Sequence, residues 1–251
     1  MFNNNILPFL LAILPVFIYM YLVHSFVPKD YIVPRRAKRY FVIGLMSTTL
    51  ITMLHYIFPN MREMNSGILF FCIFQVGVPE EMTKFITYKW TTSQRKSAHE
   101  DLPIATMYYV MLCSAGFAII ENVHYLIFYG SNVVFARAIT AIVLHLICGI
   151  IMGYYIAKSK SLKLSFFEGH SKDYIRVAKS LFVGFGIFVA AILHGIYDYN
   201  LSLDLNFYAE FMMYMFIVGG LIISFFMIKE LIRESKEIKA THDAAAKELS
   251  R

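Results

Sequence analysis

Seven long runs of apolar residues constrain the fold of this chain more than any other feature. Each run is at least about 18 residues long, the length that a helix needs to cross the hydrocarbon core of a bilayer. In chain order, the runs are Ile6–Val27, Tyr40–Phe58, Gly67–Thr87, Pro103–Tyr129, Val133–Ala157, Leu181–Leu201 and Phe207–Ile228. The sequence therefore predicts an all-α, polytopic transmembrane helical bundle of about seven spans.

The composition agrees with a protein of the cell membrane. Charged residues make up 16% of the 251 residues, whereas soluble domains carry about 25%. The first run follows no basic residue and no small-residue cleavage site, so we expect a retained helix rather than a signal peptide. We predict one transmembrane domain over residues 1–228, with the motifs at about 67–201, and a charged tail over residues 229–251.

The positions of the basic residues predict the topology. Of the 23 Lys and Arg residues, 20 fall in the tail and in the loops after the first, third and fifth runs. The alternate loops carry only Arg62. Because cytoplasmic loops are rich in Lys and Arg, we expect the N-terminus outside and the tail in the cytoplasm. The net charge of +6 is then ordinary for a membrane protein, and we expect no nucleic-acid partner.

Two adjacent carboxyl groups follow a proline in the third run. Pro79 removes a backbone donor and is expected to interrupt the helix there. Glu80 and Glu81 would then lie at the start of the second half, where a helix favours negative charge. Lys84 is four residues after Glu80 and can pair with it. A purely structural Glu–Lys pair is the alternative, although it needs only one of the two acids.

The fourth and fifth runs contribute further ionisable groups. Glu121, followed by Asn122, must find a cation or stay protonated in its apolar surroundings. Arg137 lies near the outer end of the fifth run. His145 lies within a stripe of small residues at four-residue spacing, which lets another helix approach closely. For Glu121 and His145 alike, the alternative is an interhelical hydrogen bond.

The sixth run carries His194 and Asp198 one helical turn apart on one face. This spacing suits two ligands of one metal, a carboxylate that orients an imidazole, or a structural pair. The approximate depths of Glu80, Glu121, His145 and His194 would allow them to meet in one cavity. The acids and bases in the runs leave a net charge of −2. A divalent cation or the protonation of two carboxyl groups would neutralise it equally well.

These motifs together resemble the PrsW family of intramembrane proteases, within the wider superfamily of type II CAAX-processing membrane proteases. The resemblance covers roughly residues 70–200 and keeps the family's order on four successive spans. Its elements are Glu80-Glu81-x-x-Lys84, Phe117-x-x-x-Glu121-Asn122, His145 with Gly149 and Gly153, and His194-x-x-x-Asp198.

The resemblance implies a hydrolase that cuts peptide bonds of a membrane protein or lipid-anchored peptide at or within the bilayer. Glu80 would be the general base on a metal-held water, and Glu81 would support it. Glu121, His194 and Asp198 would bind the metal or water, with His145 as a further ligand or proton donor. The implied supporting residues are Lys84, Asn122 and Arg137.

The metal implied is a divalent cation such as zinc, which accepts His nitrogen and carboxylate oxygen. The wider superfamily often has His where Glu121 stands, so fewer nitrogen ligands remain and a metal-free glutamate mechanism stays open. Two other classes of function also stay open. A proton- or cation-coupled transporter would use the same acids as an ion path, although the sequence shows no repeat. A catalytically inactive sensor or chaperone of the same fold is the other class.

Overall fold

The computed structural model describes residues 6–57, 67–94, 102–161, 171–203 and 207–249. All regular structure in these ranges is helical, which confirms the predicted all-α class. The elements are α1 (Leu7–Phe26), η1 (Lys29–Tyr31), α2 (Pro34–Ile57), α3 (Ile68–Phe70), the π-helical segment η3 (Phe71–Gly77), α4 (Val78–Ser93), α5 (Pro103–Tyr129), α6 (Ser131–Ile139), α7 (Ala141–Ser161), α8 (Lys172–Ser202) and α9 (Phe207–Leu249).

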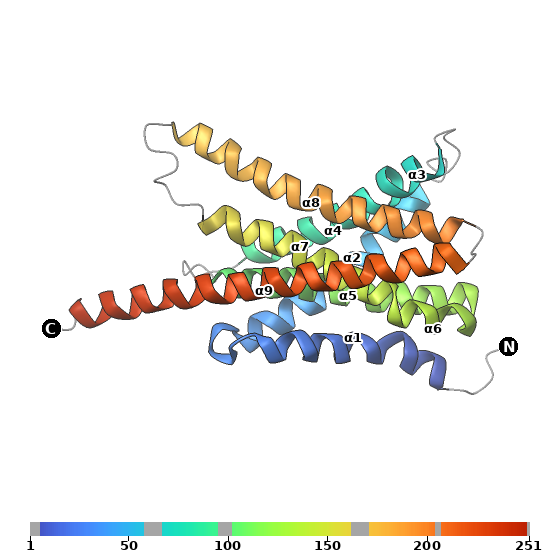
Figure 1. The fold of residues 1–251 in the computed structure, drawn as a ribbon, viewed down its shortest axis with the longest axis horizontal. Helices are drawn as coiled ribbons and strands as arrows, with labels where there is room; N and C mark the ends of the chain where they lie inside the picture. Colours follow the sequence, from blue (N-terminus) through green and yellow to red (C-terminus); the bar gives the residue numbers. More distant parts are fainter. Residues whose placement is uncertain (1–5, 58–66, 95–101, 162–170, 204–206, 250–251) are drawn as a thin grey trace.

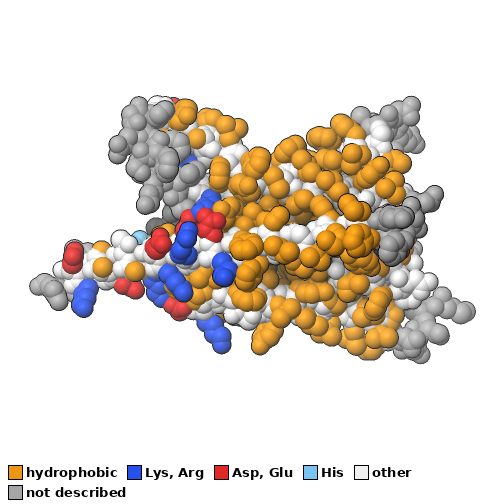
Figure 2. Space-filling view, in the orientation of Figure 1, with side chains coloured by type: hydrophobic (Ala, Val, Ile, Leu, Met, Phe, Trp, Pro, Cys, Tyr) orange, Lys and Arg blue, Asp and Glu red, His pale blue; other side chains and the backbone are white. Residues whose placement is uncertain are grey.

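The long helices run side by side as a bundle, and the C-terminal half of α9 extends beyond it (Figure 1). Large apolar side chains are exposed along α1 and along the first half of α9. Figure 2 shows apolar side chains covering the bundle on one face, while charged side chains gather along the later part of α9. A broad apolar surface next to a charged one is the distribution expected for a protein in a bilayer.

Five helices in the described ranges are long and apolar enough to cross a membrane by length and composition: Leu7–Phe26, Pro103–Tyr129, Ser131–Lys160, Lys172–Ser202 and Glu210–Glu248. The other two predicted spans coincide with α2 and with the interrupted helix α3–η3–α4. A total of seven spans and the orientation of the termini stay predictions. Arg62, Arg95 and Lys96, which enter the charge argument, lie outside the described residues.

Helices α5 and α7 form the buried centre of the bundle. Small residues of α7 allow this contact, as the stripe around His145 predicted. A Cβ added at Gly149 would lie 2.6 Å from the Ser114 side chain, and one at Gly153 would lie 2.8 Å from Met107 Cα. The two helices therefore approach closely over the two turns that follow His145.

The interrupted helix packs against α8 just as closely. A Cβ at Gly77 would lie 2.5 Å from the Ala191 carbonyl oxygen, and one at Gly195 would lie 2.5 Å from Ile73 Cα. Pro79 follows as the second residue of α4. The predicted interruption thus takes the form of a π-helix before Pro79, a feature common at functional sites. It brings the first turn of α4 next to His194.

Candidate active site

The first turn of α4 carries the two adjacent acids, and both are buried. Glu81 and Lys84 form an ion pair, with Nζ 2.7 Å from Oε1 and both side chains fully inaccessible. The sequence suggested Glu80 as the partner of Lys84, and the structure has Glu81 instead. Because residues three and four apart are both neighbours on a helix, either pairing is geometrically available.

The contacts of His145 fix its tautomer. Its Nδ1 lies 2.9 Å from the Lys84 ammonium nitrogen. An ammonium group only donates, so Nδ1 must accept, and the ring proton of a neutral imidazole must then be on Nε2. Nε2 in turn contacts Glu121 Oε2. The ammonium of Lys84 also lies 4.3 Å from the centre of the Phe117 ring. Both nitrogens of His145 are therefore engaged.

His194 has the opposite arrangement, with one nitrogen engaged and one available. Nδ1 lies 2.9 Å from Glu81 Oε1, to which it donates when it carries the proton. The lone pair of Nε2 then faces two carboxylates, with Glu80 Oε2 and Asp198 Oδ2 each 3.6 Å away. These separations are longer than a hydrogen bond. They are close to the spacing of two ligands of one metal at bond lengths of about 2.0–2.2 Å.

Glu121 is held by two partners on its other side. Its Oε1 lies 2.9 Å from the Arg137 guanidinium, and its Oε2 contacts His145. Arg137 donates from Nε to Asn122 Oδ1 at 3.0 Å and lies 3.6 Å above the Tyr125 ring. Because both oxygens of Glu121 have partners, this residue orders its neighbours in the structure rather than facing His194 Nε2.

The nine residues singled out from the sequence therefore form one connected cluster. The chain of contacts runs through Asn122, Arg137, Glu121, His145, Lys84, Glu81, His194, Glu80 and Asp198. Phe117 and Tyr125 stand at four-residue spacing with Glu121, and their rings lie beneath Lys84 and Arg137, a contact that the sequence did not assign.

The residues present fit a divalent metal. Among the described side chains, Glu80 Oε2 and Asp198 Oδ2 are both buried without a hydrogen-bond partner. Ligand atoms of Glu80, His145 and His194 all lie within 4.8 Å of one another. The cations of the cluster are already paired, Lys84 with Glu81 and Arg137 with Glu121. The negative charge left over is therefore located on the two carboxylates that face His194 Nε2.

Comparison with known proteins gives a consistent result. Residues 36–227 match the model of a family described as PrsW family intramembrane metalloprotease. The chain is similar to Protease PrsW of Oceanobacillus iheyensis, with 29% identity over 65% of this chain and 69% of the relative. Protease PrsW of Bacillus subtilis is 29% identical over 65% and 68%, and that of Clostridioides difficile is 27% identical over 78% and 79%, respectively. No solved structure matches this chain.

Proposed function

The chain belongs to the PrsW family of intramembrane metalloproteases, and from this premise we propose that it hydrolyses peptide bonds of membrane proteins or lipid-anchored peptides with a water activated by Glu80. The observation that carries the proposal is the buried, unpartnered Oε2 of Glu80, 3.6 Å from His194 Nε2. A carboxylate of this kind has no structural partner to explain its burial, so a catalytic role accounts for it.

Glu80 is the general base in this proposal. It takes the proton of the attacking water on Oε2 and passes it to the leaving amine, which completes the hydrolysis. Glu81 has a different task, since its carboxylate is bound to Lys84 and to His194 Nδ1. It orients the imidazole so that Nε2 faces the reaction site, as second carboxylates commonly do for metal-binding histidines.

We assign the metal to His194 and Asp198, and we assign His145, whose two nitrogens contact Lys84 and Glu121, to positioning rather than to the metal. When bound, a divalent metal such as zinc supplies Lewis acidity that polarises the scissile carbonyl. The family resemblance implied that Glu121 would also bind the metal or water. Its engagement with Arg137 and His145 supports a positioning role instead, in which Glu121 holds the His145 ring.

The two buried cations complete the site. Lys84 is fully buried between Glu81, His145 and the Phe117 ring. A fixed positive charge at this position favours the negative charge that develops on the carbonyl oxygen during attack. Arg137 lies one contact further away, behind Glu121, and maintains the charge balance of that carboxylate.

The test is metal content and peptide cleavage on the purified full chain in lipid. We expect the wild type to contain near-stoichiometric zinc and to cleave a membrane-tethered peptide. Glu80→Gln should keep the metal and lose cleavage, whereas His194→Ala should lose both. The matched controls are Glu210→Gln and His124→Ala, which change exposed residues and should behave as the wild type.

Two outcomes would overturn parts of this proposal. Loss of the metal in Glu80→Gln would show that Glu80 is a metal ligand, which contradicts its role as the general base. Cleavage that survives chelation in a metal-free protein would replace the metal mechanism with a purely glutamate one. Folding of every variant is checked by its melting temperature in the same lipid.

A further inference from the structure

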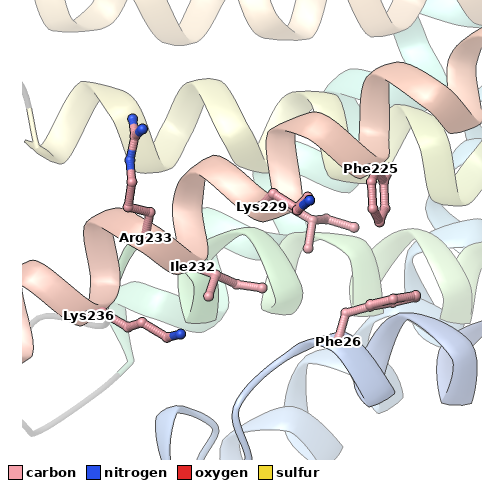
Figure 3. Close-up of a pocket in the computed structure, with 7 residues that line it drawn as sticks. Phe26, Phe225, Lys229, Ile232, Arg233 and Lys236 are labelled. Atoms are coloured by element: carbon pink, nitrogen blue, oxygen red, sulfur yellow. The ribbon is translucent and has the colours of Figure 1, made fainter.

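Apart from the active site, a groove lies between helices α1 and α9, near the start of the charged tail. It has a volume of about 430 Å³. The lining residues are Phe26 from α1 and Phe225, Ile228, Lys229, Ile232, Arg233 and Lys236 from α9. Figure 3 shows that the side chains of Phe26 and Phe225 lie at one end of it. Their rings are 5.9 Å apart in an edge-to-face arrangement.

The groove is apolar at one end and cationic along the other. Lys229, Arg233 and Lys236 are exposed, whereas Ile228 is buried against the bundle. Figure 3 shows their terminal nitrogens spread along α9 rather than gathered at one point. None of the described residues that line the groove is acidic. Such an arrangement fits an extended amphipathic ligand with an anionic head better than a compact free anion.

The acids nearest to these three cations form their ion pairs with other basic residues. Glu230 and Glu234 of α9 both pair with Lys158 of α7. Asp30 of η1 pairs with Lys239 of α9, and this ion pair and hydrogen bond hold the pKa of Asp30 below its ordinary value. None of Lys229, Arg233 and Lys236 forms an ion pair with another described residue. The face of α9 that borders the groove is therefore positively charged.

We propose that this groove binds an anionic phospholipid of the cytoplasmic leaflet. The position of the groove supports this ligand, because it lies where the apolar surface of the bundle gives way to the charged part of α9 (Figure 2). In this proposal the acyl chain packs against Phe26, Phe225 and Ile228, and the anionic head group lies in the positive field of the cations along α9. Basic pockets at the cytoplasmic ends of transmembrane helices recognise anionic head groups in this way.

The test is lipid binding to the purified full chain, measured by native mass spectrometry against phosphatidylglycerol and phosphatidylcholine with identical acyl chains. We expect the wild type to retain phosphatidylglycerol preferentially. A cation near a membrane surface strengthens such binding by about fivefold, so a triple substitution should weaken it by on the order of 100-fold. The substituted residues are Lys229→Gln, Arg233→Gln and Lys236→Gln.

A second triple variant is the matched control. Lys172→Gln, Arg176→Gln and Lys179→Gln remove two lysines and one arginine from α8, at the same predicted side of the membrane and away from the groove. This control should keep the preference for phosphatidylglycerol. Equal losses in both triple variants would overturn the proposal in favour of general surface charge. Displacement of the lipid by inorganic phosphate would also overturn it, since a free anion would then be the ligand.

Discussion

Replacing Gly195 by alanine tests whether the close packing of α8 on the π-helix sets the geometry of the active site. The added Cβ would lie 2.5 Å from Ile73 Cα and 2.7 Å from Ile73 N. Ordinary contacts of this kind are 3.4–4 Å long, so the two backbones must separate by about 1 Å. Ile73 Cα and N are backbone atoms, so the rotation of a side chain cannot relieve their overlap with the new Cβ.

The expected effect follows from the neighbouring residue. His194 moves with α8, while Glu80 stays with α4, so their separation of 3.6 Å should grow. A misplacement of about 1 Å typically costs about 100-fold in rate, and we expect that loss in kcat/KM for a membrane-tethered peptide. Overpacking should also lower the free energy of unfolding by about 1–3 kcal/mol. Rates are therefore compared at a temperature where both proteins are fully folded.

Gly184→Ala is the matched control on the same helix. Nothing lies within 4 Å of a Cβ at Gly184, and alanine is the better helix former by about 1 kcal/mol. This variant should keep the wild-type kcat/KM and melt at the same temperature or slightly higher. Wild-type rate and stability in Gly195→Ala would refute the reasoning, because the overlap would then be absorbed without moving His194.

Three further predictions use the same protein in lipid or detergent. Lys84→Met should lower the free energy of unfolding by about 3–5 kcal/mol, since it leaves Glu81 buried without its cation; adding Glu81→Gln should restore most of the loss in a denaturant titration. Ser235→Ala should cost about 1–3 kcal/mol in the same titration, because the buried Ser235 hydroxyl accepts the Ile104 N–H at the start of α5, at 3.0 Å. Chelation should lower the melting temperature of the wild type but not that of His194→Ala; equal shifts in the two proteins would contradict a metal at His194.

The fold class followed from the sequence because the physics of the bilayer leaves few choices. A chain with this many long apolar runs can satisfy its backbone in lipid only as helices or a closed barrel, and runs of this length favour helices. The stripe of small residues around His145 likewise predicted a close helix contact, which the structure has between α7 and α5. Both arguments use the pattern within one helix, and a sequence pattern reports most directly on such local structure.

The details of the cluster depend on contacts between helices, which the sequence does not encode locally. The sequence places His194 and Asp198 on one face of the sixth run, whereas the close contact of α8 with η3 uses Ala191 and Gly195 on an adjacent face. The choice of Glu81 as the partner of Lys84 depends on His194 approaching from another helix. The π-helix before Pro79 has no residue signature of its own, and the groove between α1 and α9 contains no motif.

The pairing of acids with bases inside the bundle connects the sequence with the structure. The sequence shows four acids and two bases within the apolar runs but cannot say which acids lack a partner. In the structure, each base has taken one acid, and the two acids left over both lie 3.6 Å from a single imidazole nitrogen. Two ionised carboxylates around one nitrogen atom repel each other and are costly to bury. Protonation of these groups or a bound divalent cation would compensate this charge, and the donor atoms present are ones that a divalent cation such as zinc accepts.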